Sequence, residues 1–305
     1  MRRLVVLLTL LVAVAGCGSD ESGSRPVTVA LDFVPNPVHA PIYLAGDAVR
    51  IQTPGTGPDG LKLVTSGKVE LGVLDIHDLA IAREQGSDVV AVAALVGRPL
   101  AALVAQPDVK RPRELEGRTV GVSGLPSDPA FLKAIVEHDG GNVEKIEQVT
   151  IGFNAVARLL TERVDAVPVF WHAEGVALKQ RGLDANEFRV EDYGAPPYPE
   201  VVLFTSRATL ERERDRIKGA LDAIARGLEA VRARPDEAVD VIADAAETDD
   251  RALVQAQTDA VLPIFADGLR LDRDVLEQWA DFDVAIGLVG RRPDVARAFD
   301  FTLRP

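Results

Sequence analysis

Cysteine is almost absent from this chain of 305 residues, which has Cys17 and no other. An intrachain disulfide is therefore excluded, and so are a CxxC redox motif and a zinc site built from several cysteines. The four histidines show no HExxH spacing, and no GxSxG sequence is present. These absences argue against a metal centre and against a hydrolase nucleophile. We predict no metal, no cofactor and no catalytic residue.

Positive charge is also scarce, because 34 Lys and Arg residues stand against 47 Asp and Glu residues and give a net charge of −13. Nucleic-acid-binding proteins favour basic surfaces, so this composition argues against such a partner. No stretch after the N-terminal region is long and apolar enough to span a bilayer, which takes about 20 residues. We predict a mature protein that is soluble apart from an N-terminal anchor.

The N-terminal segment has the features of a lipoprotein signal peptide. Arg2 and Arg3 precede a short apolar run, and small residues stand directly before Cys17. The pattern predicts a signal peptide over residues 1–16, a lipid on the Cys17 thiol, and a polar tether over residues 17–25. The alternative is an ordinary secretory signal with an incidental cysteine. We expect an exported protein, anchored through Cys17 to the outer face of the cytoplasmic membrane.

Short apolar strands alternate with helices in the first two thirds of the chain, a pattern typical of α/β proteins. The polar stretch Asp108–Gly117 separates two such units. The predicted strands are Val27–Phe33, Val49–Gln52, Leu71–Leu74, Val89–Ala94, Leu100–Ala105, Arg118–Val122, Glu147–Ile151, Ala166–Phe170 and Val201–Thr205.

Helical periodicity dominates after Ser206, where apolar residues recur every three or four positions until Pro235. Earlier in the chain, residues 34–48 are just numerous enough for a parallel crossover with one short helix. The predicted helices are His39–Ala48, Asp128–His138, Asn154–Arg163, a long helix from before Ile217 to Pro235, and 236–246, 250–262 and 272–286.

Two α/β units joined by two crossings are the layout of a hinged binding protein. We predict one lobe from residues 26–107 and 205–305, with the C-terminal helices packed on it, and a second lobe from residues 108–204. Open α/β sheets bind ligands outside the carboxyl ends of their strands. The residues that directly follow strands are therefore the candidates for a binding site.

The first candidate segment follows the first strand. It offers a carboxylate, an aromatic ring, an amide, an imidazole and a phenol from Asp32, Phe33, Asn36, His39 and Tyr43. Two prolines stiffen this turn and would hold the groups in a fixed arrangement. The alternative is a structural turn, with Phe33 in the core and Asn36 capping a helix.

Two further segments follow strands in the same way. Asp75 and His77 come after the third predicted strand, where Asp75 could cap a helix while His77 faces the cleft. Ser123 lies in a Gly/Ser/Pro turn whose backbone N–H groups could approach a ligand, ahead of a helix capped by Ser127 or Asp128. A solvated histidine and a tight turn are the alternatives.

Large aromatic residues stand beside carboxylates in the last two segments. Trp171 and Glu174 follow a strand, and Tyr198 and Glu200 precede one on a proline-rich stretch. Trp171 and Tyr198 could sandwich a flat heterocycle, and the carboxylates could accept hydrogen bonds from an exocyclic amine. Core packing is the alternative for each segment taken alone.

Several motifs, in order, resemble one family. LDFVPNPVHAPIYLA resembles its LDWxPNxxHxGxYxA opening, SGLPSDPAFLKAIV its GxPSDxAxLxxxV segment, FWHAEG its YWNxEG, and DYGAPPYPEVVL its DYGVPxYxELVL. These motifs are typical of the substrate-binding lipoproteins of ABC importers that carry a thiamine pyrimidine precursor (hydroxymethylpyrimidine). That family lies within the wider group of alkanesulfonate, nitrate and taurine binders.

The resemblance implies a two-lobed periplasmic-binding-protein-like fold (type II) with a double-crossover hinge. It implies a monomeric receptor that binds an aminopyrimidine-like ligand and passes it to an ABC transporter permease. Its pocket would use Phe33, Asn36, His39, Trp171 and Glu174, together with Tyr198 and Glu200. A riboflavin, sulfonate or nitrate ligand is the alternative within the binding class. A pyrimidine-synthesising or pyrimidine-remodelling enzyme is the alternative outside it, although the cysteine-rich motif of the related synthases is missing.

The chain departs from the family pattern at two places. Phe33 stands where relatives often have Trp, which offers a larger stacking face and an indole N–H. Around Ala45–Val49 the chain omits roughly a dozen residues that relatives carry, which is about the length of a minimal crossover. We therefore expect a short first helix.

Overall fold

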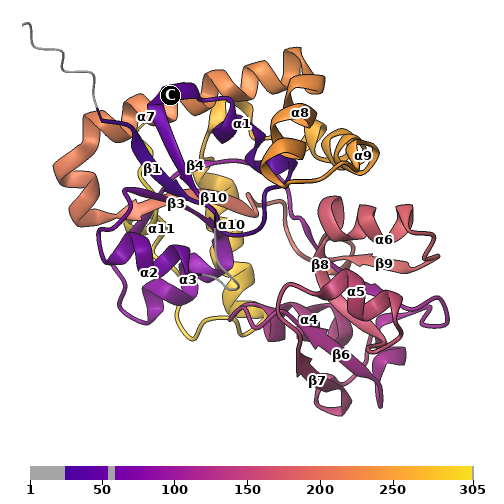
Figure 1. Cartoon of the computed structure of the whole chain (residues 1–305). Coiled ribbons are helices and arrows are strands. Elements are labelled where there is room, and N and C mark those ends of the chain that lie inside the picture. The colour runs from indigo at the N-terminus through magenta and orange to yellow at the C-terminus, as the bar shows by residue number, and fades with distance from the viewer. Residues whose placement is uncertain (1–24, 54–58, 304–305) are drawn as a thin grey trace, which may run out of the picture.

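The computed structural model describes residues 25–53 and 59–303. The predicted signal peptide, Cys17 and all of the tether except Arg25 lie outside these ranges. Within them, the chain forms two α/β bodies side by side, each around a five-stranded sheet (Figure 1). None of the helices in the described part is long and apolar enough to cross a membrane.

The first sheet has the strand order β2-β1-β3-β10-β4. Strand β1 pairs in parallel with β2 and β3, as a crossover connection requires, whereas β10 is antiparallel to β3 and β4. Strand β1 ends earlier than predicted, so Asp32 and Phe33 lie in the turn after it. The strands are β1 (Val27–Ala30), β2 (Val49–Gln52), β3 (Leu71–Asp75), β4 (Val89–Ala94) and β10 (Val201–Ser206).

The second sheet has the order β7-β6-β8-β5-β9, and here β5 is the strand antiparallel to both of its neighbours. The edge strand β9 was not predicted, because its sequence NEFR has one apolar residue and no β-branched one. The strands are β5 (Ala101–Ala105), β6 (Thr119–Val122), β7 (Glu147–Thr150), β8 (Ala166–Phe170) and β9 (Asn186–Arg189).

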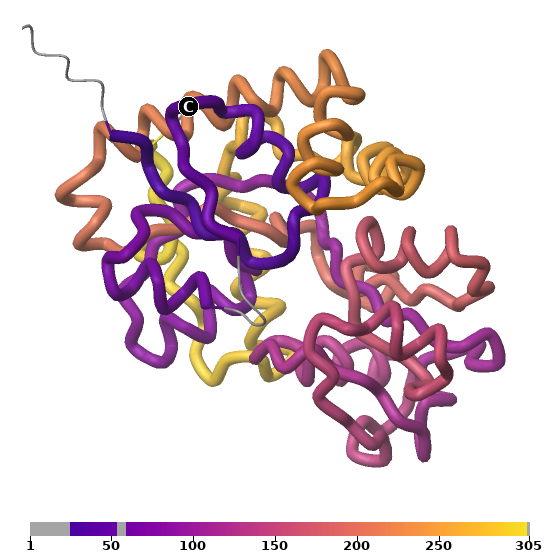
Figure 2. Tube along the Cα trace, viewed as in Figure 1, coloured from indigo at the N-terminus to yellow at the C-terminus, as the bar shows by residue number. Residues whose placement is uncertain are grey.

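The chain crosses between the two bodies twice. It leaves the first sheet after β4 and enters the second at β5, and it returns from β9 to β10. Both crossings are visible in Figure 2, where the later part of the chain comes back to the first body. The two predicted crossings are therefore present, and the exact limits assigned to the lobes stay a prediction.

The expected helix over His39–Ala48 is broken into three short turns: η1 (Pro37–His39), α1 (Ala40–Tyr43) and η2 (Gly46–Ala48). Gly46 has a φ of +64°, a conformation that favours glycine and interrupts the helix. The expectation of a short first helix is confirmed. Before the C-terminal helices the chain also forms α2 (Gly60–Thr65), α3 (Ile76–Glu84), η3 (Pro112–Leu115), α4 (Asp128–His138), η4 (Val143–Lys145), α5 (Ala155–Leu160), η5 (a π-helical turn, Trp171–Gly175), α6 (Val176–Gln180) and η6 (Val190–Tyr193).

The C-terminal helices cover the first body, as predicted. Helix α7 packs on α1 and on β1, β4 and β10, and α11 packs on β4. Helix α9 also contacts η5 and α6 of the second body. There the side-chain amide of Gln257 donates to the carbonyl of Ala173 at 2.9 Å. The helices are α7 (Arg207–Ala233), α8 (Pro235–Ala245), α9 (Arg251–Val261), α10 (Arg273–Ala285) and α11 (Val295–Ala298).

Helix α7 approaches the turn at α1 so closely that only glycine fits at one position. A Cβ atom at Gly227 would lie 2.1 Å from the carbonyl oxygen of Pro41, whereas a Cβ at Gly219 on the same helix would meet nothing within 4 Å. We expect Gly227→Ala to lower the free energy of unfolding by about 1–3 kcal/mol through overpacking. The matched variant Gly219→Ala should raise it by about 0.5–1 kcal/mol, because alanine favours the helix.

Urea unfolding of the two variants checks this contact. Equal gains in stability from both substitutions would show that α7 and α1 leave room for a methyl group at Gly227.

Candidate functional site

A cavity of about 210 Å³ lies between the two bodies and is lined by both. The carboxyl ends of strands from each sheet contribute to it, as expected for an open α/β sheet. Its lining includes Asp32, Phe33, Leu74, Asp75, Asp78 and Ile81 from the first body and Ala102, Ser123, Ser127, Asp128, Phe131, Phe153, Phe170 and Glu174 from the second. We refer to this cavity as the cleft.

Two phenylalanines meet across the cleft. The rings of Phe33 and Phe153 come from different bodies and lie edge to face, with their centroids 4.6 Å apart. A flat ligand that entered between them could pack against both rings. Sequence reasoning selected Phe33 and missed Phe153, although Phe153 follows the predicted strand Glu147–Ile151 just as the other candidates follow theirs.

The turn after β1 holds Asp32 in place. Asn36 caps η1 by accepting a hydrogen bond from the backbone N–H of Val38 at 3.1 Å. The backbone N–H of Asn36 donates in turn to Nδ1 of His39 at 3.3 Å. The other ring nitrogen of His39 lies 2.9 Å from Oδ1 of Asp32. Asn36 and His39 therefore shape the turn and hold the carboxylate, while Tyr43 packs against the core of the first body.

The Gly/Ser turn after β6 is closed by a carboxylate. Oδ2 of Asp128 accepts hydrogen bonds from the Ser123 hydroxyl at 2.8 Å and from the Gly124 backbone N–H at 3.0 Å. The Leu125 N–H donates to the Ser123 hydroxyl. These donors, expected to face a ligand, are thus engaged, and an acid occupies the place where an anion would bind.

Every ionisable side chain in the described lining is an acid: Asp32, Asp75, Asp78, Asp128 and Glu174. Burial, followed by the neighbouring charge of Asp128, raises the pKa of Asp78 to about 7. Burial likewise raises the pKa of Glu174 to about 7 and that of Asp128 above its ordinary value. The cleft therefore favours ligand groups that donate hydrogen bonds or carry positive charge.

Glu200 ties the two crossings together. Its Oε2 accepts hydrogen bonds from the backbone N–H groups of Leu100 and Ala101, at 2.6 and 2.9 Å, where the chain enters the second body. Its own carbonyl accepts from the N–H of Ile76 at 2.9 Å. Glu200 is fully buried on the returning crossing. Through these three hydrogen bonds it joins both crossings to the start of α3.

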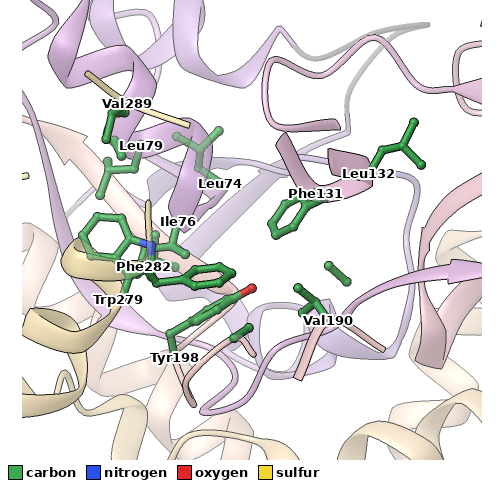
Figure 3. Packing of buried hydrophobic residues seen from close by; sticks show 14 of the residues in the cluster. Leu74, Ile76, Leu79, Phe131, Leu132, Val190, Tyr198, Trp279, Phe282 and Val289 are labelled. Carbon is green, nitrogen blue, oxygen red and sulfur yellow. The ribbon is translucent and has the colours of Figure 1, made fainter. Parts of the chain in front are cut away.

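His77 and Tyr198 belong to the same hinge region rather than to the cleft lining. Asp75 caps α3 by accepting from the N–H of His77, and Nδ1 of His77 lies 2.6 Å from Oδ1 of Asp283 on α10. Tyr198 is fully buried, edge-on to His77 and stacked on Phe282. Figure 3 shows Tyr198, Phe282 and Trp279 gathered together, with Phe131 of α4 facing them.

One set of side chains among the described residues could offer metal ligands. Asp75, His77 and Glu200 place three ligand atoms within 4.8 Å of one another. The two carboxylates already accept backbone N–H groups, and His77 contacts Asp283. These contacts anchor the hinge, but Nε2 of His77 and Oε1 of Glu200 are buried without a hydrogen-bond partner.

Trp171 is buried beside the first crossing. Its indole N–H donates to the Pro99 carbonyl at 3.1 Å, and the guanidinium of Arg189 lies 4.0 Å from the ring centroid. Next to it, burial lowers the pKa of His172 to about 3, so this imidazole is neutral. The structure gives Trp171 packing contacts within the protein and does not place it in the cleft lining.

Five of the twelve sequence-predicted binding residues thus line the cleft, and they are Asp32, Phe33, Asp75, Ser123 and Glu174. The other seven are not part of the lining, and they are Asn36, His39, Tyr43, His77, Trp171, Tyr198 and Glu200. Sequence reasoning had treated Asp128 only as a possible cap and had not selected Asp78. Asp78 stands in the segment that contains Asp75 and His77, and Asp128 in the segment that contains Ser123. Their position shortly after a strand could have identified both as binding residues.

The buried acids predict that the ligand-free protein loses stability as the pH rises. A carboxyl whose pKa is raised by folding stabilises the folded state while protonated, and this contribution is lost between its unfolded pKa, near 4, and about 7. We expect the thermal midpoint to fall more between pH 5 and 8 in the wild type than in an Asp78→Asn, Glu174→Gln double variant. Parallel pH profiles of the two proteins would contradict the description of these carboxyls.

The chain is similar in sequence to a pyrimidine-binding protein and to a pyrimidine synthase. It is 32% identical over 256 residues to a formylaminopyrimidine-binding protein of Halalkalibacterium halodurans, covering 79% of this chain and 78% of that protein. It is 24% identical over 267 residues to a 4-amino-5-hydroxymethyl-2-methylpyrimidine phosphate synthase of Legionella pneumophila, covering 81% and 83%.

The fold is that of known periplasmic binding proteins. The alkanesulfonate-binding protein SsuA from Xanthomonas axonopodis pv. citri, solved bound to MOPS, superposes with a TM-score of 0.73 at 16% identity, covering 90% of this chain and 98% of that one. Over residues 36–238, more than half of its length, the sequence matches the family described as NMT1/THI5 like. The chain belongs to the NMT1/THI5-like family.

Proposed function

We propose that this protein is the solute-binding component of an ABC importer and that its ligand is a small aminopyrimidine of the thiamine-precursor class. One observation carries the proposal: a cleft between two hinged bodies whose walls combine phenylalanines with carboxylates. The phenylalanine rings can pack on the faces of a flat ring, and the carboxylates can accept hydrogen bonds from its amino group. Membership of the family and the similarity to a formylaminopyrimidine-binding protein support it.

The size of the cleft favours a single ring over a flavin. A cavity of about 150 Å³ accommodates benzene in another protein, so about 210 Å³ has room for one substituted six-membered ring. The three fused rings of riboflavin and its ribityl chain would need far more space.

The charge of the cleft disfavours sulfonate and nitrate. An anion needs Arg, Lys or free backbone N–H groups, and the described lining holds no cationic side chain. At the helix start where backbone N–H groups could receive an anion, Asp128 already accepts one of them. We therefore place anionic ligands second.

We propose a receptor without catalytic turnover. Some relatives are named as synthases, so the family alone does not separate the two roles. The resemblance assigns a cysteine-rich motif to those enzymes, and the one cysteine here is Cys17, the predicted site of lipid attachment. Incubation with a candidate pyrimidine should leave one equivalent bound and no product by mass spectrometry.

Export and lipid anchoring through Cys17 are part of the same proposal. They rest on the basic, apolar and small-residue pattern that precedes Cys17. The binding protein would then stand on the outer face of the cytoplasmic membrane as a monomer and deliver its ligand to a permease.

A thermal-shift panel tests the proposed function. Pyrimidines of the thiamine-precursor class should raise the melting temperature of the protein, because a ligand that binds only the folded state stabilises it. Riboflavin, alkanesulfonates and nitrate should give no shift. Stabilisation by sulfonates or nitrate alone would reject the pyrimidine assignment.

A further inference from the structure

A buried polar cluster lies at the hinge, where the two crossings meet the start of α3. Its members are Asp75, His77 and Glu200, and one side-chain atom of each lies within 4.8 Å of the other two. His77 and Glu200 have no exposed surface, and 6% of Asp75 is exposed. The rings of Phe131 and Tyr198 stand edge-on to His77 with centroids at 4.7 Å. The protein therefore encloses three groups that water would otherwise satisfy.

Two atoms of this cluster have no hydrogen bond at the place where they face each other. Nε2 of His77 lies 3.8 Å from Oε1 of Glu200. Both atoms are buried without a hydrogen-bond partner. Such atoms are costly to bury unless an ion or an ordered water binds to them. An imidazole nitrogen and a carboxylate oxygen are also two of the ligand atoms that metal ions take in proteins.

The cluster carries more negative charge than it balances. Burial, followed by the charge of Glu200, raises the pKa of Asp75 well above its ordinary value. Asp283 places a third buried carboxyl beside His77. Within the described ranges, no lysine or arginine forms an ion pair with any of these three acids. Protons or a bound cation are therefore needed to compensate their charge.

Asp283 prepares His77 to bind a metal ion. Its Oδ1 lies 2.6 Å from Nδ1 of His77, while the indole N–H of Trp279 is farther from the same nitrogen, at 3.3 Å. The closer carboxylate favours a proton on Nδ1 and leaves a lone pair on Nε2, the nitrogen nearer to Glu200. Histidines that bind metal ions are commonly held in this way, with the other ring nitrogen donating to a carboxylate.

We infer that Asp75, His77 and Glu200 bind one divalent transition-metal ion, for which zinc is the probe. One imidazole and two carboxylates suit zinc, whereas calcium and magnesium prefer oxygen ligands alone. Three atoms within 4.8 Å of one another share a point about 2.8 Å or less from each. A movement of less than about 1 Å by each ligand would therefore reach the zinc distance of about 2.0–2.2 Å.

The ion would strengthen the hinge rather than contact the solute. Asp75 ends β3 and caps α3, and Glu200 already holds Leu100 and Ala101 of the first crossing. A metal ion between them would join both crossings to the first body. Asp75 is the ligand that also lines the cleft, so the ion would enter from the cleft while the two bodies are apart. The prediction of no metal rested on the spacing of neighbouring residues, and Glu200 is far from the other two ligands in sequence.

Zinc titration of the protein after removal of metal ions with a chelator tests the inference. Calorimetry should show one equivalent of zinc per chain with a Kd in the micromolar range or below. At a zinc concentration of about 100 times this Kd, the melting temperature should rise by at least about 4 °C. Calcium and magnesium at the same concentration should give no rise.

Three variants that each remove one ligand separate metal binding from folding. Asp75→Asn keeps an acceptor for the α3 cap, Glu200→Gln keeps a carbonyl for the two N–H groups, and His77→Gln removes the imidazole. Each should weaken zinc binding by at least about 10- to 100-fold, the loss typical for residues that only support a metal ligand. The zinc-dependent rise is measured within each variant, so a lower stability of the metal-free form does not imitate the effect. His138→Gln, at an exposed histidine of the second body, is the matched control and should bind zinc as the wild type does.

Two outcomes would overturn the inference. If the wild type takes up no zinc, either when folded or during refolding from urea with zinc present, the cluster is compensated by protons or an ordered water. If zinc binding persists in all three ligand variants and is lost in His138→Gln, it is adventitious binding at the surface. Neither outcome bears on the proposed function, because the ligand panel is measured without zinc.

Discussion

Replacing Glu200 with alanine should lower the free energy of unfolding by about 3–5 kcal/mol, because it removes a buried carboxylate on which several groups depend. Without it, the buried N–H groups of Leu100 and Ala101 lose their acceptor. Each unsatisfied buried donor costs roughly 1–3 kcal/mol. His77, whose Nε2 lies 3.8 Å from Glu200, would lose a neighbouring negative charge as well.

Glu200→Gln is the informative companion to this variant. Glutamine keeps a carbonyl oxygen for the two N–H groups and nearly the same volume, so most of the lost stability should return. Glu144→Ala, at an exposed glutamate of the second body, should change stability by less than about 0.5 kcal/mol. Urea unfolding measures all three. A Glu200→Ala protein as stable as the wild type would show that Glu200 does not anchor the two crossings.

Truncating Phe33 should have the largest effect on binding among the cleft residues. Phe33→Ala removes one of the two rings that meet across the cleft, and we expect the ligand affinity to fall by about 1–3 kcal/mol, or roughly 5- to 150-fold. Phe33→Trp introduces the larger ring that members of the family often have at this position. It should recover or exceed the wild-type affinity if the ring stacks on the ligand.

Calorimetric titration with an aminopyrimidine measures this series. Val34→Ala serves as the neighbouring control, because half of the surface of Val34 is exposed to solvent and its side chain does not line the cleft. If Phe33→Ala binds as tightly as the wild type, the ring takes no part in recognition, and the cleft loses its aromatic wall on the first body.

Part of the site could be predicted because the local sequence shows where each strand ends, and ligands of open α/β sheets bind at the carboxyl ends of strands. Asp32, Phe33 and Ser123 follow apolar runs that form parallel strands, and the carboxyl ends of such strands face the cleft. The same logic applied to β7 would have found Phe153. The chain-length argument also held, since the few residues before β2 form only short helical turns.

The direction of a side chain depends on distant partners, and these were not visible in the sequence. His77 contacts Asp283, which lies 206 positions later, and Tyr198 stacks on Phe282 of the same C-terminal helix. Trp171 contacts Pro99 across the crossings. A single sequence shows that these residues follow or precede strands. The sequence does not show which of these residues are buried under helix α10 or against the crossings and which face the cleft.

The charge of the cleft was the feature most difficult to predict. Asp78 and Asp128 stand in separate motifs, each explicable as a first-turn acid of a helix. Their importance comes from the way the two bodies face each other, which makes them neighbours across the cleft. Only the assembled fold brings the two like charges together.

A crystal structure of the protein with a bound aminopyrimidine is the most direct test of the central claim. We predict one pyrimidine ring between Phe33 and Phe153, with its amino groups within hydrogen-bonding distance of cleft carboxylates such as Asp78 and Glu174. A ligand bound outside the space between the two bodies, or one held there by arginine or lysine side chains, would contradict the account.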